Sequence, residues 1–112
     1  MQDEPLIGQT CVACRGGMPS LTREEAEALL PQVPGWNIAD DAKSIRRDFT
    51  FKNYAEALDL LNKVSAVAEA EGHHPDYSGG WGRLTLVLTT HAIKGLSKND
   101  FIIAAKTNAL LS

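Results

Sequence analysis

The 112-residue sequence lacks both long apolar runs and basic clusters. Its apolar stretches are only a few residues long, so none could span a bilayer. No basic run exceeds two residues (Arg46 and Arg47), and the formal net charge is −3. Phosphate backbones bind to positive surfaces, so we expect neither a nucleic-acid nor a membrane partner. The first ten residues lack the basic and apolar regions of a secretory signal, which predicts a cytoplasmic protein.

Cysteine is scarce as well, because Cys11 and Cys14 are the only two in the chain and form a single CxxC pair. A structural zinc site needs four ligands. The glycines and the proline that follow the pair are not typical of the helix start of a thioredoxin-like redox motif. Three interpretations stay open: a reduced pair with little structural role, a local disulfide or metal site, and a functional pair.

The length and the composition predict one domain with one core. The hydrophobic fraction of 44% and the charged fraction of 22% are ordinary for a globular protein. Glycine and proline interrupt residues 1–20 without any apolar period, so we expect an irregular N-terminal arm there. Residues 21–112 are then a single α+β domain.

Alternating helix and strand signals follow the arm. Thr22 and Glu25 form a capping box for a first helix, which Pro31 ends. A short strand over 36–39, a turn at Asp40 and Asp41, and a strand over 44–51 come next. Residues 53–71 predict a long helix that Gly72 ends, with a core-facing stripe at helical spacing. The stripe comprises Tyr54, Leu58, Leu61, Val64 (or Ser65) and Ala68.

The C-terminal third adds one or two strands and a last helix. Leu84, Leu86 and Leu88 alternate with polar or smaller residues, which predicts a strand with one face on the core. Ser97 and Asp100 form a cap-like pair before a helix over 98–111. The pattern predicts an α+β fold of order α-β-β-α-β-β-α, an antiparallel sheet with helices packed on one face.

All three histidines of the chain fall between residues 73 and 91. His73 and His74 follow the predicted end of the long helix, and His91 is expected on the strand face opposite the leucines. Glu69 lies one helical turn before the pair and could hold a histidine in one tautomer. The spacing leaves three interpretations open: surface or turn residues, a three-histidine zinc site without a known ligand spacing, and acid/base chemistry on a small molecule.

Longer stretches carry a more specific signal. The segments "AEAEGHHPDY", "TTH" and "GLSKNDFIIAAKTNAL" occur in this order, after a Gly-Trp pair at 35–36. From Leu21 to Leu110 the chain resembles the pterin-4a-carbinolamine dehydratase family. This resemblance implies a lyase that removes water from 4a-hydroxytetrahydropterin to give quinonoid dihydropterin, in support of tetrahydropterin recycling.

The resemblance also implies residue roles. His73 and His91 would transfer protons, and His74 would bind the pterin and tune the site. Four further residues would contact the substrate or orient a histidine, namely Glu69, Thr89, Thr90 and Trp36, although Trp36 could equally be a core anchor. No metal and no cofactor are implied, and the family forms homodimers or homotetramers by pairing sheet edges or packing helices.

Two departures from the family pattern stand out. Gly72 replaces the usual Asn or Asp before the histidine pair, and the glycine-rich segment 77–84 predicts a loose or bulged strand edge. The alternative function is a non-catalytic binding, assembly or coactivator protein on the same scaffold, since the family includes such roles. A pure scaffold has no need to keep Glu69 and all three histidines together, so their joint presence favours the enzyme.

Overall fold

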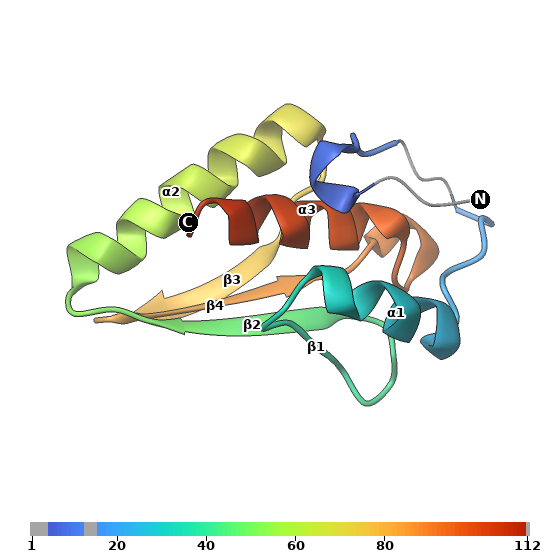
Figure 1. The fold of residues 1–112 in the computed structure, drawn as a ribbon, viewed down its shortest axis with the longest axis horizontal. Coiled ribbons are helices and arrows are strands. Elements are labelled where there is room, and N and C mark those ends of the chain that lie inside the picture. The colour runs from blue at the N-terminus through green and yellow to red at the C-terminus, as the bar shows by residue number, and fades with distance from the viewer. Residues whose placement is uncertain (1–4, 13–15, 112) are drawn as a thin grey trace.

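The computed structural model describes residues 5–12 and 16–111. Within these residues, four antiparallel strands form one sheet in the order β1-β2-β4-β3. Helices α2 and α3 lie on the same face of the sheet (Figure 1). The structure confirms the predicted α+β fold and the order of its helices and strands. The strands are β1 (Asn37–Ile38), β2 (Ile45–Thr50), β3 (Asp76–Gly80) and β4 (Arg83–Leu88), and the helices are α1 (Arg23–Leu29), α2 (Tyr54–Glu71) and α3 (Lys98–Ala109).

Each helix begins at the predicted cap. A side-chain oxygen of the cap residue accepts a hydrogen bond from a backbone N–H of the first turn, which would otherwise lack a partner. In α1 and α3 the acidic residue of the first turn bonds back to the cap, completing the predicted capping boxes. The cap residues are Thr22, Asn53 and Ser97.

Gly72 ends α2 in the left-handed conformation, with φ of 69°. The N–H of His73 then donates to the carbonyl oxygen of Ala68, 3.1 Å away, as in a Schellman motif. Glycine reaches this backbone region without a Cβ clash. The sequence therefore fixes where the chain leaves the helix, and with it the start of the histidine pair.

Strand β4 supplies the centre of the core. Leu84, Leu86 and Leu88 are all buried, as the alternation predicted, and they pack in one hydrophobic cluster with α2 and α3. The buried residues of α3 include Phe101 and Ile103. Burial of several large side chains at roughly 1.5–3 kcal/mol each provides most of the driving force that holds the helices on the sheet.

The predicted core stripe of α2 is only partly correct. Val64 and Ala68 are buried, but the other buried positions are Ala57 and Leu60. Tyr54 and Leu58 are 53% and 41% exposed, respectively. Apolar residues occupy more than one face of this helix, so periodicity alone could not decide which face meets the sheet and α3.

The expected bulge at the glycine-rich edge is absent from the described β3–β4 pairing. Five consecutive residue pairs, from Asp76 with Val87 to Gly80 with Arg83, keep an uninterrupted antiparallel register. Glycine is nevertheless required at position 79, because a Cβ there would collide with the Arg83 carbonyl oxygen. The glycines here allow close strand approach and do not distort the strand.

The N-terminal arm contacts the core. A 3-10 turn, η1 (Leu6–Gly8), packs against α3, and Leu6 is 1% exposed. Two further 3-10 turns lie in the described chain, η2 (Leu30–Gln32) and η3 (His91–Ile93). Over the ranges that the structure describes, no helix combines the length and apolarity needed to cross a membrane.

Candidate active site

The histidines surround one cavity of about 270 Å³. It lies where the C-terminal end of α2, the end of β4, η3 and the start of α3 meet. The end of β4, η3 and the start of α3 follow one another closely along the chain, and the pairing of β3 with β4 brings the end of α2 to them. The lining residues are Val12, Gly72, His73, His74, Thr89, Thr90, His91, Ala92 and Asn99.

His73 forms a nearly buried pair with Asp100 of α3. Its Nε2 atom lies 2.6 Å from Oδ1 of Asp100, and the two side chains are 12% and 0% exposed. A carboxylate only accepts hydrogen bonds, so the ring nitrogen donates. In a neutral His73 this bond places the proton on Nε2 and the lone pair on Nδ1, and it fixes the orientation of the ring.

Two further donors hold Asp100 in place. Its Oδ2 atom accepts from the Thr90 hydroxyl at 2.8 Å and from the backbone N–H of Ser97 at 3.0 Å. The same carboxylate therefore caps α3 and orients His73. Thr90 is 3% exposed and also contacts the Ser97 hydroxyl at 2.7 Å. Its hydroxyl is thus engaged in this network at the cavity wall.

His74 pairs with Glu69 at the surface. Its Nε2 atom lies 2.7 Å from Oε1 of Glu69, and the side chains are 59% and 82% exposed. Glu69 does not line the cavity, so it contacts the site through this histidine. Solvent weakens such a pair, which makes it more useful for orientation than for stability.

His91 lies on η3 and not on a strand, which corrects the predicted position. Strand β4 ends at Leu88, and the chain turns at Thr90 and again at Lys94, whose φ is 55°. The His91 side chain is 75% exposed, with Nε2 3.6 Å from Oδ2 of Asp76. The turn reorients the third histidine and brings it to the cavity from the β3 side.

The two remaining predicted residues lie in different places. Thr89 lines the cavity, and its hydroxyl donates to the Lys43 carbonyl oxygen at 2.6 Å. Trp36 is 3% exposed in the core, and its indole N–H donates to Oδ1 of Asn108 at 2.9 Å, near the far end of α3. Trp36 is thus placed as a core anchor, apart from the histidines.

Cys11 is a free, half-buried thiol next to the end of α2. Burial first, and then the carboxylate of Glu71, raises the pKa of the Cys11 thiol to about 12. Reactive cysteines have lowered pKa values, so Cys11 has the opposite environment. Cys14 lies outside the described residues. Among those that are described, no group of three or more His, Cys, Asp or Glu side chains is arranged to hold a metal ion.

Sequence reasoning missed four residues of the site. Asp100 was predicted as a helix cap only, although its place in the family-like segment could have suggested more. Asp76 directly follows the "HHP" motif, but nothing in its spacing indicated a partner for His91. Val12 and Asn99 carried no signal, since only the folded chain brings the arm to α3.

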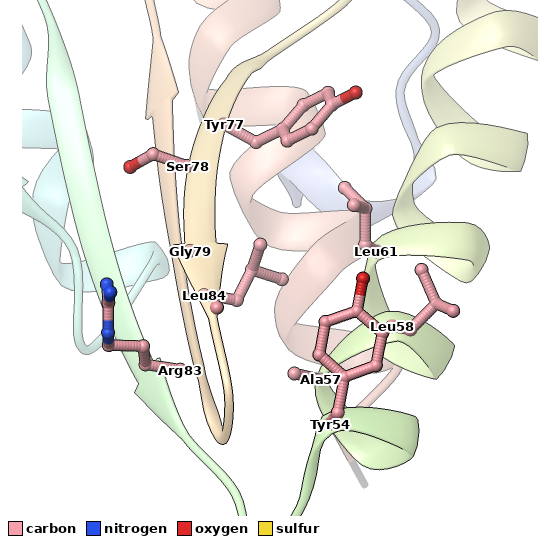
Figure 2. A pocket seen from close by; sticks show the side chains of 10 residues that line it. Tyr54, Ala57, Leu58, Leu61, Tyr77, Ser78, Gly79, Arg83 and Leu84 are labelled. Carbon is pink, nitrogen blue, oxygen red and sulfur yellow. The ribbon is translucent and has the colours of Figure 1, made fainter.

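A second pocket, of about 150 Å³, lies between α2 and the β3–β4 hairpin (Figure 2). Figure 2 shows Leu61 of α2 next to Tyr77 of β3, and Tyr54 and Leu58 nearer the start of α2. The lining is mainly apolar, so this pocket offers contact surface and little acid/base chemistry.

At the first cavity, each of the three histidines has its own carboxylate partner, at 2.6, 2.7 and 3.6 Å. One pair is shielded from solvent and two are open to it. Imidazoles accept and donate protons near neutral pH, and the paired carboxylates orient them. Fold and site together define a small α+β protein in which three histidines, each next to a carboxylate, line one cavity.

Comparison with known proteins identifies the family. The family model for "Pterin 4 alpha carbinolamine dehydratase" matches residues 19–110. The chain belongs to this family, as the resemblance predicted.

The chain is 54% identical over 107 residues to the "Putative pterin-4-alpha-carbinolamine dehydratase 1" of Cupriavidus pinatubonensis, covering 96% of this chain and 92% of the relative. It is 50% identical over 105 residues to the "Putative pterin-4-alpha-carbinolamine dehydratase" of Methylococcus capsulatus, covering 94% of this chain and 92% of the relative.

Two solved structures share the fold. A "transcriptional coactivator/pterin dehydratase" from Brucella melitensis is 30% identical, with a TM-score of 0.79 over 84% of this chain and 100% of that chain. A "pterin dehydratase-like protein" described as a RuBisCO assembly factor in the α-carboxysome is 23% identical, with a TM-score of 0.59 over 68% and 88%. The second likeness concerns the fold alone.

Proposed function

We propose that this protein dehydrates 4a-hydroxytetrahydropterin to quinonoid dihydropterin by histidine acid/base catalysis. The observation that carries the proposal is the convergence of three histidines, each next to a carboxylate, on one cavity. Family membership supplies the substrate class. The reaction consists of proton transfers around a C–O cleavage, so it requires no redox cofactor.

The reaction needs an acid and a base on one substrate. The C4a–O bond breaks as an acid gives its proton to the hydroxyl group, which leaves as water. The adjacent ring nitrogen loses its proton to a base, and a double bond forms between that nitrogen and C4a. Protonation of the poor leaving group and deprotonation of the ring each contribute typically about 10²–10⁴ in rate.

His73 suits the base. Asp100 holds its Nε2–H at 2.6 Å, which leaves the Nδ1 lone pair for the substrate proton. The same carboxylate then stabilises the imidazolium that forms, as in other carboxylate–histidine pairs.

His91 suits the acid, since its exposed ring can regain a proton from water after each turnover. His74, oriented by Glu69, binds the pterin and tunes the site. Thr89 and Thr90 line the same cavity and contact the substrate there.

The direct test follows the ultraviolet change as freshly generated 4a-hydroxytetrahydropterin is dehydrated at neutral pH. We expect wild type to exceed the spontaneous rate clearly, and His73→Ala and His91→Ala each to lower kcat by about 10² or more. His74→Ala is expected to act mainly on KM. Trp36→Phe is the matched control, because this side chain lies in the core away from the cavity.

The same assay distinguishes the alternative. A folded wild-type protein that does not accelerate the reaction would refute catalysis and leave a binding or assembly role on this scaffold. The exposed histidines and carboxylates would then be tested for protein partners. The cytoplasmic location stays a prediction.

We also propose that the chain forms a homodimer or homotetramer. Support comes from exposed apolar side chains at the α2–β3 pocket, where Tyr54, Leu58 and Tyr77 are 53%, 41% and 62% exposed (Figure 2). Strand β3 also lies at an edge of the sheet. Edge strands and contiguous apolar patches are the surfaces that partner subunits usually cover.

A further inference from the structure

The N-terminal arm is held by a charged pair from two helices. Glu71 at the end of α2 accepts a hydrogen bond from the Cys11 N–H at 2.8 Å. Lys106 of α3 donates to the Ile7 carbonyl oxygen at 3.0 Å. The two charged groups lie 3.8 Å apart, and their side chains are only 15% and 19% exposed. Charge-assisted hydrogen bonds in such partly buried places are stronger than neutral ones, so the backbone of residues 7–11 is firmly docked.

The side chain of Asn99 binds both backbone groups of Val12, the residue that follows this docked segment. Its Oδ1 atom accepts from the Val12 N–H at 3.0 Å, and its Nδ2 donates to the Val12 carbonyl oxygen at 2.6 Å. Asn99 is 4% exposed and directly precedes Asp100, the partner of His73. Val12 is 66% exposed and lines the histidine cavity. The arm thus places one apolar side chain at the cavity wall, on an anchor adjacent to the proton-transfer pair.

We propose that Val12 is a specificity-determining residue of the pterin site and that Asn99 is the positioning residue that holds it there. The inference rests on the proposed function and adds a wall that contacts the substituent carried by the pterin ring. The cavity of about 270 Å³ is slightly smaller than the roughly 300–1,000 Å³ usual for ligand pockets. A change of one side chain at this wall therefore alters a considerable share of the available space.

The test compares carbinolamines with a methyl group and with a longer polar chain at ring carbon 6. For Val12→Trp we expect KM for the longer substrate to rise about tenfold or more relative to the methyl analogue, since misfit in a pocket costs about 10–200-fold. The kcat should change less than about threefold, because a wall contact binds ground state and transition state alike. Val12→Ala should shift the preference toward the longer substrate.

Thr10→Trp is the matched control. It adds the same bulk two residues earlier, at an exposed position that does not line the cavity. This variant should keep the wild-type ratio of kcat/KM values for the two substrates. A ratio that is unchanged in both Val12→Trp and Val12→Ala would overturn the inference, as would an equal effect of Thr10→Trp.

Asn99→Ala tests the positioning role. We expect faster hydrogen exchange of the Val12 amide and a changed ratio of the kcat/KM values for the two substrates. A purely structural role would lower the melting temperature and leave the ratio unchanged.

Binding separates this inference from the proposed function. Calorimetric titration with 7,8-dihydrobiopterin, which has no hydroxyl group at C4a to lose, is measured for wild type and Val12→Trp. If wild type binds but does not catalyse, the dehydratase proposal fails, and a weaker affinity of Val12→Trp still supports the wall. Equal affinities of the two proteins overturn only the role of Val12 in specificity. If wild type does not bind the ligand, both the role of Val12 and the dehydratase proposal are overturned.

Discussion

Replacement of Asp100 by asparagine tests the centre of the proposed mechanism. The carboxylate is fully buried and accepts hydrogen bonds from His73, Thr90 and Ser97 at 2.6–3.0 Å. An asparagine of the same shape can keep its oxygen toward the donors at Thr90 and Ser97, but it then turns an NH₂ group toward His73. His73 must become the acceptor at Nε2, so its proton moves to Nδ1 and the lone pair needed for catalysis is lost.

Two magnitudes follow from this geometry. Loss of a general base lowers kcat by typically about 10²–10⁴. A hydrogen bond to a charged group contributes about 1.5–3 kcal/mol, so the loss of charge at this site should cost about 3 kcal/mol. An unfolding entropy of about 2.1 cal/mol/K for each of 112 residues converts this loss to a fall in Tm of about 13 °C.

The assay measures kcat by the ultraviolet change and Tm by circular dichroism on the same samples. Leu86→Ala is the control, because truncation of this buried β4 side chain should cost about 2–5 kcal/mol without touching the cavity. We expect a similar loss of stability in both variants and a large loss of kcat only in Asp100→Asn. A folded Asp100→Asn protein with kcat within about threefold of wild type would refute the role assigned to the His73–Asp100 pair.

Three further predictions concern other parts of the molecule. The pKa of Cys11 is raised from an ordinary 9.0 to about 12, so the fraction of thiolate at pH 8 is strongly reduced. In a variant that lacks the other cysteine, iodoacetamide should therefore label Cys11 about 10² or more times more slowly in the native protein than in the unfolded protein. Equal labelling rates would contradict this prediction. Leu58→Glu should reduce the mass of the oligomer measured by light scattering. Leu111→Glu is the control and should not reduce it, although Leu111 is nearly as exposed as Leu58 (42% against 41%). Equal masses of the two variants would argue against a subunit contact through α2. Gly72→Ala should lower the free energy of unfolding by about 1 kcal/mol, because the φ of Gly72 is 69°. Gly8→Ala is the control and should leave the stability unchanged, because no atom lies within reach of an added Cβ. Thermal unfolding of both variants measures the difference.

Local rules explain why much of the fold could be predicted. The caps at Thr22, Asn53 and Ser97 act within four residues, so the local sequence predicts where each helix begins. The alternation of leucines in β4 likewise determines which side of that strand is buried. The face of α2 was not predictable in this way, because its apolar residues cover more than one side and packing chose between them.

The site shows the same division. The sequence itself contained three histidines, the acidic residue before them and the family pattern, and these determined the family and predicted acid/base chemistry. Only the tertiary structure paired His73 with Asp100 of a different helix, turned His91 onto η3, placed Trp36 in the core and brought Val12 to the cavity. Sequence patterns report interactions between near neighbours along the chain, whereas the distances that make a catalytic site join residues that meet only after the sheet and helices have packed.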